Sequence, residues 1–267
     1  MKRLPGLRRM LTTAAPATPN RRRFGRWYVG ALVGYPAVWI GSSLALGRVT
    51  GTDDVSYERI LDPVPRVLLW RAALPQALAG GLSLVWARRA PRPMTVRDIV
   101  AQPGRRRGWL WAPAGLTCAV AFALVAEGYR TERTGADGAT SSGEQRRPPL
   151  PPVGDQAALL ATTLVIGVCE ETMYRGVIQR AALDEGFDET AVGVLSAVAF
   201  GLLHLPNALL GEPLRGAIRQ TGVTAVIGLG EHSLFRQSGH LAVPALVHGV
   251  WDFGAGMAGR RSEPAVE

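Results

Sequence analysis

Hydrophobic residues in this chain are gathered into long runs instead of alternating regularly with polar ones. About 20 consecutive apolar residues are enough for a helix to cross a bilayer. The runs are 27–46, 67–87, 109–126, 157–183, 190–203, 218–229 and 241–257. They predict an all-α fold, a polytopic transmembrane helical bundle with about seven spans. The sixth run is the weakest, because Arg219 and Glu231 stand at its ends.

Polar segments between the runs predict the domain organisation. The expected segments are a basic cytoplasmic arm at 1–26, amino-terminal transmembrane helices at 27–129, a Pro/Gly-rich linker at 130–154, a second helical domain at 155–258 and a tail at 259–267. Arginine clusters flank the apolar runs at 21–23, 88–89 and 105–107. The positive-inside rule places such clusters in the cytoplasm, so we expect the amino terminus to be cytoplasmic.

Composition supports a membrane protein and argues against a nucleic-acid-binding one. The 267 residues are 47% hydrophobic and 19% charged, and the net charge of +9 comes from arginines beside apolar runs. Lys2 is the only lysine, a bias typical of a GC-rich genome, and we expect an integral protein of a bacterial plasma membrane. Cys118 and Cys169 both lie in apolar runs, where thiols mostly serve as small hydrophobic side chains.

The most informative segment is the run that leads into two adjacent carboxylates, Glu170 and Glu171. A charge at the centre of a membrane-spanning helix costs roughly 2.5–3.5 kcal/mol on insertion scales, so a retained pair indicates a function. Arg175 stands four residues after Glu171, in the favourable order for an ion pair on one helix face. We therefore expect Glu171 to pair with Arg175 and Glu170 to be available for chemistry. The alternative is that both glutamates mark the headgroup region.

Two later runs each carry a histidine that lies one helical turn from a possible partner side chain. Phe200 and His204 share one helix face, and His248 and Asp252 share another. A single histidine in an apolar helix is more often a packing residue. Three such helices together must bring their ionisable groups to one another or to water. Imidazole, carboxylate and water are the parts of carboxylate-assisted or metal-assisted hydrolysis.

In this order, the motifs Glu170-Glu171-x-x-x-Arg175, Phe200-x-x-x-His204 and His248-x-x-x-Asp252 resemble those of the CPBP intramembrane proteases, the CAAX protease and bacteriocin-processing or Abi family. The resemblance covers about 155–254. It implies an intramembrane endopeptidase whose substrate is a peptide or protein in or near the bilayer. Glu170 would activate water as the general base, and His204 would share that water. His248 and Asp252 would stabilise the oxyanion. Glu171 would belong to the same catalytic group, with Arg175 and Phe200 as structural support.

The resemblance leaves the role of a metal open. Zinc or another divalent metal could be held by His204, His248, Asp252 and Glu170, and a metal-free glutamate mechanism is equally compatible. The residue familiar at the position of Asp252 is asparagine, which can donate a hydrogen bond to an oxyanion. An ionised aspartate only accepts, so Asp252 would either ligate a cation or act when protonated.

Two other functions fit the same polar groups. One is a non-catalytic membrane protein of the same fold, such as an immunity or partner-binding protein. The other is a proton or ion carrier, because intramembrane carboxylates and histidines also form relays. Other protease classes are disfavoured, since the chain contains neither a His-Glu-x-x-His nor a Gly-x-Ser-x-Gly motif.

Overall fold

The computed structural model describes residues 21–55, 60–101 and 150–259, and the regular elements in this part of the chain are all helices. The prediction of an all-α fold is therefore confirmed. The helices are α1 (Arg21–Thr50), α2 (Pro65–Val67), η2 (Leu68–Ala73), α3 (Leu74–Arg89), α4 (Val96–Val100), α6 (Val153–Glu171), η4 (Thr172–Ile178), α7 (Gln179–Asp184), α8 (Glu189–Leu203), η5 (Leu205–Leu210), α9 (Leu214–Ser238) and α10 (Ala242–Gly259).

Within the described residues, four helical segments are long and apolar enough to cross a membrane. They are Arg22–Thr50, Pro65–Arg89, Val153–Asp184 and Glu189–Leu210. The predicted count of about seven spans is not confirmed. The run 109–126 lies outside the described residues. The runs 218–229 and 241–257 fall in α9 and α10, which are helical but are not among these four.

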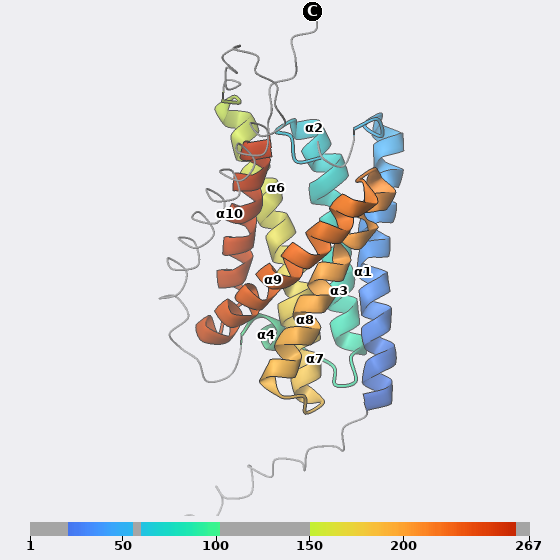
Figure 1. The fold of residues 1–267 in the computed structure, drawn as a ribbon, viewed down its shortest axis with the longest axis vertical. Coiled ribbons are helices and arrows are strands. Elements are labelled where there is room, and N and C mark those ends of the chain that lie inside the picture. Colours follow the sequence, from blue (N-terminus) through green and yellow to red (C-terminus); the bar gives the residue numbers. More distant parts are fainter. Residues whose placement is uncertain (1–20, 56–59, 102–149, 260–267) are drawn as a thin grey trace, which may run out of the picture.

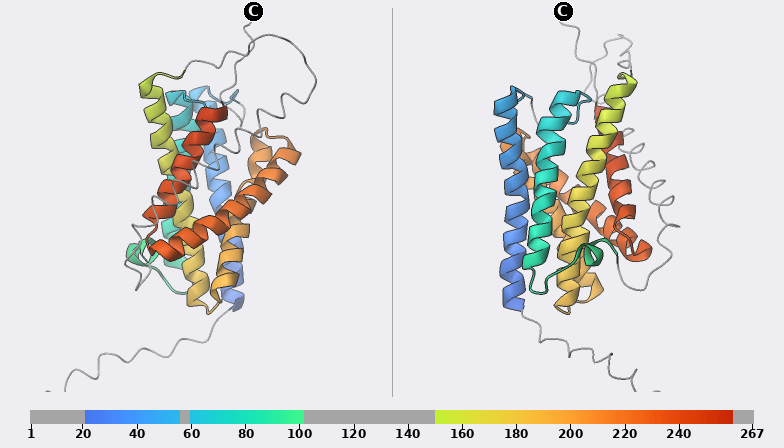
Figure 2. Two further views of the ribbon diagram at one scale, coloured as in Figure 1. Left: turned by 60° about the vertical axis from the view of Figure 1, so that its left-hand side comes forward. Right: turned by 180° about the vertical axis from the view of Figure 1, so that it is seen from behind.

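The helices form a bundle in which α1, α3 and α6 run side by side, as the view from behind in Figure 2 shows. The most extensive contacts join α6 to α10 and α8 to α9, and α9 crosses the front of α8 obliquely (Figure 1). At the α6–α10 crossing, a Cβ built on Gly167 would lie 2.5 Å from the Ala245 carbonyl oxygen and 2.9 Å from the Gly249 nitrogen. Glycine at this point therefore permits the approach that brings α10 against the end of α6.

Two of the spans contain a widened turn with π-helical hydrogen bonding. The segment 153–184 is continuous, as the run 157–183 predicts, but η4 interrupts its α-helical geometry directly after Glu171. The segment 65–89 is interrupted in the same way by η2. Each π turn carries one fully buried arginine, Arg175 in η4 and Arg71 in η2. Such turns occur frequently at functional sites.

A short helix, α4, packs outside the spans against η4. The Thr95 hydroxyl accepts from the Asp98 backbone N–H, and the Asp98 carboxylate accepts in return from the Thr95 backbone N–H at 2.8 Å. The Thr95 hydroxyl also donates to the Asp98 carboxylate at 2.7 Å. This hydrogen bond and the one from the Thr95 backbone N–H lower the pKa of Asp98 below its ordinary value. Ile99, in the same turn, lies over Gly176 of η4. The segment that follows α3 thus includes a capped helix that packs against η4.

Candidate active site

Arg175 is the positive centre of a cluster of buried polar side chains. Its Nη1 donates to Glu171 Oε1 at 2.9 Å, as the four-residue spacing predicts, and its Nη2 donates to the Gly228 carbonyl oxygen at 3.2 Å and to Glu231. The guanidinium also lies 4.4 Å from the centre of the Phe200 ring. Arg175 and both carboxylates are almost completely buried. One cation therefore holds two carboxylates and joins η4 to α8 and α9.

Glu231 is a member of this cluster that the sequence interpretation missed. It stands at the edge of the weakest apolar run, where a charge normally marks the end of a span. In the structure it lies inside α9 and is 4% exposed, pointing toward Arg175 and His248. The sequence did contain a signal: neither glycine nor proline occurs in 231–238. A helix that includes Glu231 can therefore continue for seven more residues, as α9 does.

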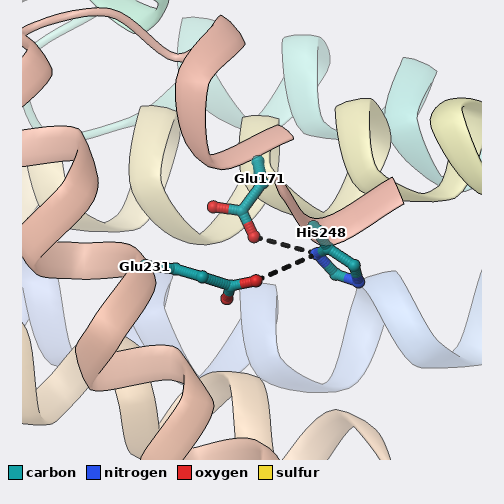
Figure 3. A group of neighbouring side chains, drawn as sticks. All are labelled: Glu171, Glu231 and His248. Carbon is teal, nitrogen blue, oxygen red and sulfur yellow. Dashed lines mark hydrogen bonds and ion pairs between the residues drawn. The ribbon is translucent and has the colours of Figure 1, made fainter. Parts of the chain in front are cut away.

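His248 on α10 lies among four carboxylates. Its Nδ1 is 3.1 Å from Glu171 Oε1 and 3.5 Å from Glu231 Oε1, and Figure 3 shows both glutamates directed at this nitrogen. Its Nε2 is 3.4 Å from Asp252 Oδ2 and 3.7 Å from Glu170 Oε2. Because ionised carboxylates only accept hydrogen bonds, we assign a proton to Nδ1. The surrounding negative charge stabilises a positive charge on this ring.

Glu170 is oriented by residues from the amino-terminal helices. The Gln76 side chain on α3 donates to Glu170 Oε1 at 2.7 Å, and the Tyr35 hydroxyl on α1 donates to Gln76 Oε1 at 2.8 Å. The second oxygen, Oε2, is buried and accepts no hydrogen bond from the residues that the structure describes. Neither Gln76 nor Tyr35 belongs to a sequence motif, so the sequence did not indicate that they contact this site. Gln76 thus holds one carboxylate oxygen of Glu170 in place, and the other oxygen can still accept a hydrogen bond.

His204 ends α8, and its ring is oriented by the preceding turn. Its Nδ1 lies 3.1 Å from the Phe200 carbonyl oxygen. A carbonyl only accepts, so we assign the proton to Nδ1, which leaves Nε2 with a lone pair in the neutral ring. The Phe200 ring stands nearly perpendicular to both histidine rings, 5.3 Å from that of His204 and 5.5 Å from that of His248. Phe200 therefore separates and positions the two imidazoles.

The polar side chains border one cavity of about 250 Å³. Four residues predicted from the motifs line it: Glu170, His204, His248 and Asp252. The other three, Glu171, Arg175 and Phe200, do not line the cavity; they lie behind these side chains and hold them. The structure thus brings all seven predicted residues together. The lining also includes residues from outside the motifs, among them Trp39, Asp62, Arg71, Gln76 and Gln220.

The donor atoms suit a divalent cation in type, but their charge is already balanced. Within the described residues, Glu171, Glu231 and His248 bring three ligand atoms within 4.8 Å of one another. Two carboxylate oxygens and an imidazole nitrogen resemble the ligands of catalytic zinc. Both carboxylates, however, contact the Arg175 guanidinium. A second cation would have to share these oxygens with Arg175, so we derive no catalytic step through a metal.

The carboxy-terminal part of the chain is similar to a known protein family. Residues 152–254 match the family model described as type II CAAX prenyl endopeptidase Rce1-like. The match begins just before α6, ends within α10 and includes all three motifs. No curated protein and no solved structure matches the chain.

Proposed function

Because residues 152–254 belong to the Rce1-like family of CAAX endopeptidases, we propose that this integral membrane protein is an intramembrane endopeptidase in which Glu170 activates the attacking water. The observation that carries the proposal is the position of Glu170, which lines a cavity together with His204, His248 and Asp252. Gln76 fixes its Oε1, while its Oε2 accepts no hydrogen bond from the described residues. The substrate is a peptide or protein whose scissile bond reaches this cavity at the membrane.

The proposed reaction uses Glu170 as a general base and then as an acid. A water between Glu170 and Nε2 of His204 gives its proton to Glu170 as its oxygen bonds to the carbonyl carbon. The carbonyl oxygen becomes an oxyanion, which the positively charged His248 ring stabilises electrostatically. When the C–N bond breaks, Glu170 returns the proton to the leaving nitrogen. General acid–base catalysis of this kind contributes typically about 10²–10⁴-fold in rate.

Asp252 acts through His248 in this scheme. Its carboxylate faces the imidazole Nε2 at 3.4 Å, and Glu171 and Glu231 face Nδ1. These three groups orient the ring and keep its positive charge favourable beside a developing oxyanion. The aspartate at position 252 can therefore contribute without donating a hydrogen bond to the oxyanion itself.

The Glu170→Gln variant tests the assignment. The amide oxygen can still accept from Gln76, so folding should be preserved, but the side chain can no longer take a proton. Cleavage of a quenched fluorescent peptide by the purified protein in detergent should fall by about 10²-fold or more. Glu189→Gln is the matched control, because Glu189 is exposed on α8 and pairs with Arg236 outside the cavity lining. Wild-type cleavage by Glu170→Gln would refute the mechanism and favour a non-catalytic protein of the same fold.

A metal-assisted version is the second candidate, favoured by the cluster of Glu171, Glu231 and His248. A bound cation there would supply Lewis-acid chemistry. Metal content of the purified protein, measured by mass spectrometry, should be compared between the wild type and His248→Ala. Stoichiometric zinc that is lost in the variant would establish this version. Metal-free protein that retains cleavage activity would exclude it.

A further inference from the structure

Glu170 is linked to two side chains from outside the segment that matches the family. Gln76 belongs to α3 and Tyr35 to α1, whereas the family match covers residues 152–254. Together they form the Tyr35–Gln76–Glu170 series, in which the Tyr35 hydroxyl donates to Gln76 Oε1 at 2.8 Å and Gln76 Nε2 donates to Glu170 Oε1 at 2.7 Å. All three side chains are buried, so water does not compete for either hydrogen bond.

The direction of these hydrogen bonds follows from the chemistry of the amide. A glutamine side chain has one oxygen, which only accepts, and one NH₂ group, which only donates. The Tyr35 hydroxyl satisfies the oxygen, and the NH₂ group is turned toward Glu170. If the amide were reversed, its oxygen would face a carboxylate oxygen, and two acceptors would meet in a buried site. The Tyr35 hydroxyl thus favours the orientation in which Gln76 donates to Glu170.

The series determines which oxygen of Glu170 takes part in the proposed reaction. Because Oε1 accepts from Gln76, the proton from the attacking water goes to Oε2, which accepts no hydrogen bond from the described residues. A carboxylate that rotated about its Cγ–Cδ bond would offer either oxygen, in a range of directions. The hydrogen bond from Gln76 restricts this rotation. A misplacement of about 1 Å can lower the rate by roughly 10²-fold, so the restriction matters for catalysis.

Contacts on both sides of the series hold Tyr35 and Gln76 in place. The Tyr35 ring meets the Tyr174 ring of η4 edge-on, with 5.9 Å between their centres. Gln76 follows Pro75, which has no N–H, so the Arg71 carbonyl oxygen lacks the donor that an α-helix would provide. That oxygen accepts from Ser43 Oγ on α1 at 3.0 Å. The segment before Gln76 is therefore tied to the helix that carries Tyr35.

We propose that Gln76 and Tyr35 are positioning residues for the proposed reaction, and that Tyr35 acts on Glu170 through Gln76. Gln76 fixes Oε1 and leaves Oε2 for the water, while Tyr35 keeps the Gln76 amide in its donating orientation. The inference rests on the proposed function, because it assigns roles around the same base. It also means that residues 152–254 do not orient this base alone, and that the amino-terminal helices complete the active site.

Steady-state cleavage of the quenched fluorescent peptide by the full-length protein in detergent tests this inference. Gln76→Met has a similar length but no amide, and it should lower kcat by about 10–100-fold. Tyr35→Phe removes only the hydroxyl and should lower kcat by roughly threefold to tenfold, the scale of one neutral hydrogen bond. KM should stay unchanged in both variants, because the interactions that are lost orient the base and do not bind the substrate.

The double variant Tyr35→Phe/Gln76→Met separates positioning from a structural role. Once the amide is gone, the Tyr35 hydroxyl has nothing to orient, so the double variant should have the same kcat as Gln76→Met. A structural role would lower kcat by the Tyr35→Phe factor in both backgrounds.

Tyr28→Phe is the matched control on the same helix. The Tyr28 hydroxyl donates to the Leu195 carbonyl oxygen on α8 at 2.8 Å, and Tyr28 does not line the cavity. The variant loses one hydrogen bond between helices, as Tyr35→Phe does, and should keep the wild-type kcat. Thermal unfolding of both variants shows whether their stabilities match. This pair carries the test if Gln76→Met does not fold.

Each other outcome overturns the inference. A wild-type kcat in Gln76→Met means that the amide is not needed to orient Glu170, and a loss confined to KM means that Gln76 binds substrate. Additive losses in the double variant, or equal losses of kcat in Tyr35→Phe and Tyr28→Phe, mean that Tyr35 supports the fold. Failure of the proposed function looks different: Glu170→Gln then cleaves at the wild-type rate, and the inference falls with it.

Discussion

The buried cluster around Arg175 leads to a quantitative prediction for Arg175→Met. Methionine has a similar length but removes the charge and all the donors. The variant leaves the carboxylates of Glu171 and Glu231 facing each other, and it leaves the Gly228 carbonyl oxygen without its donor. Among the basic side chains of the described residues, His248 alone remains close to both carboxylates.

The interactions lost in this variant are large compared with the stability of a fold. Removing one partner of a buried ion pair costs about 3–5 kcal/mol, because the other charge is left uncompensated. The guanidinium also lies over the Phe200 ring, a contact worth up to about 2 kcal/mol when desolvated. A domain is typically stable by only about 5–15 kcal/mol. We therefore expect Arg175→Met to lose a large fraction of the free energy of unfolding.

The assay is reversible unfolding in mixed micelles, followed by tryptophan fluorescence as the fraction of sodium dodecyl sulfate rises. Arg175→Met should lower the free energy of unfolding by at least about 3 kcal/mol. The double variant Arg175→Met/Glu231→Gln should recover part of this loss, because one unpaired carboxylate is gone. Asp184→Asn is the control: it breaks the partly exposed pair with Arg180, and an i,i+4 pair of this kind contributes only about 0.3–0.5 kcal/mol.

The reasoning would be refuted if Arg175→Met unfolded within about 1 kcal/mol of the wild type, the scale of an exposed pair. It would also be refuted if the double variant were less stable than Arg175→Met, since removing the unpaired carboxylate should help. Both results would mean that Arg175 does not neutralise Glu171 and Glu231 in the folded protein.

Two further predictions concern packing and pH. Gly167→Ala should destabilise the fold by about 1–3 kcal/mol, because the added methyl group overpacks the α6–α10 crossing, and it should reduce cleavage by moving His248. Thermal unfolding measures the loss of stability. Gly154→Ala is the control and should show no loss, because its Cβ meets nothing within 4 Å. Hydrogen bonds from Thr95 lower the pKa of Asp98. At pH values above the ordinary carboxyl pKa, ionised Asp98 therefore stabilises α4, and this contribution is lost as the pH falls through the lowered pKa. The protection factor of the Ile99 amide against hydrogen exchange should therefore fall at acid pH in the wild type. In Asp98→Asn the protection factor should be lower at neutral pH and should lack this acid-dependent step, and an unchanged pH profile in that variant would contradict the prediction.

Local spacing in the sequence was sufficient to predict the long helices and the contacts between residues one turn apart within them. Apolar runs predicted the segments that became α1, α3, α6 and α8, since a helix of that length is the simplest way to satisfy backbone groups in a bilayer. The ion pair of Glu171 with Arg175 and the proximity of His248 to Asp252 followed from the helical repeat alone. These are contacts between residues four positions apart.

Only the tertiary structure decided which other side chains meet these motifs. Glu231 reaches Arg175 across 56 positions of the chain, and Gln76 reaches Glu170 across 94. Neither residue belongs to a periodic pattern. Their positions depend on how α3 and α10 pack on α6 and how α9 packs on α8, and close backbone approach at glycines permits this packing. Helical periodicity determines which face a residue occupies, but the packing of whole helices determines what that face touches.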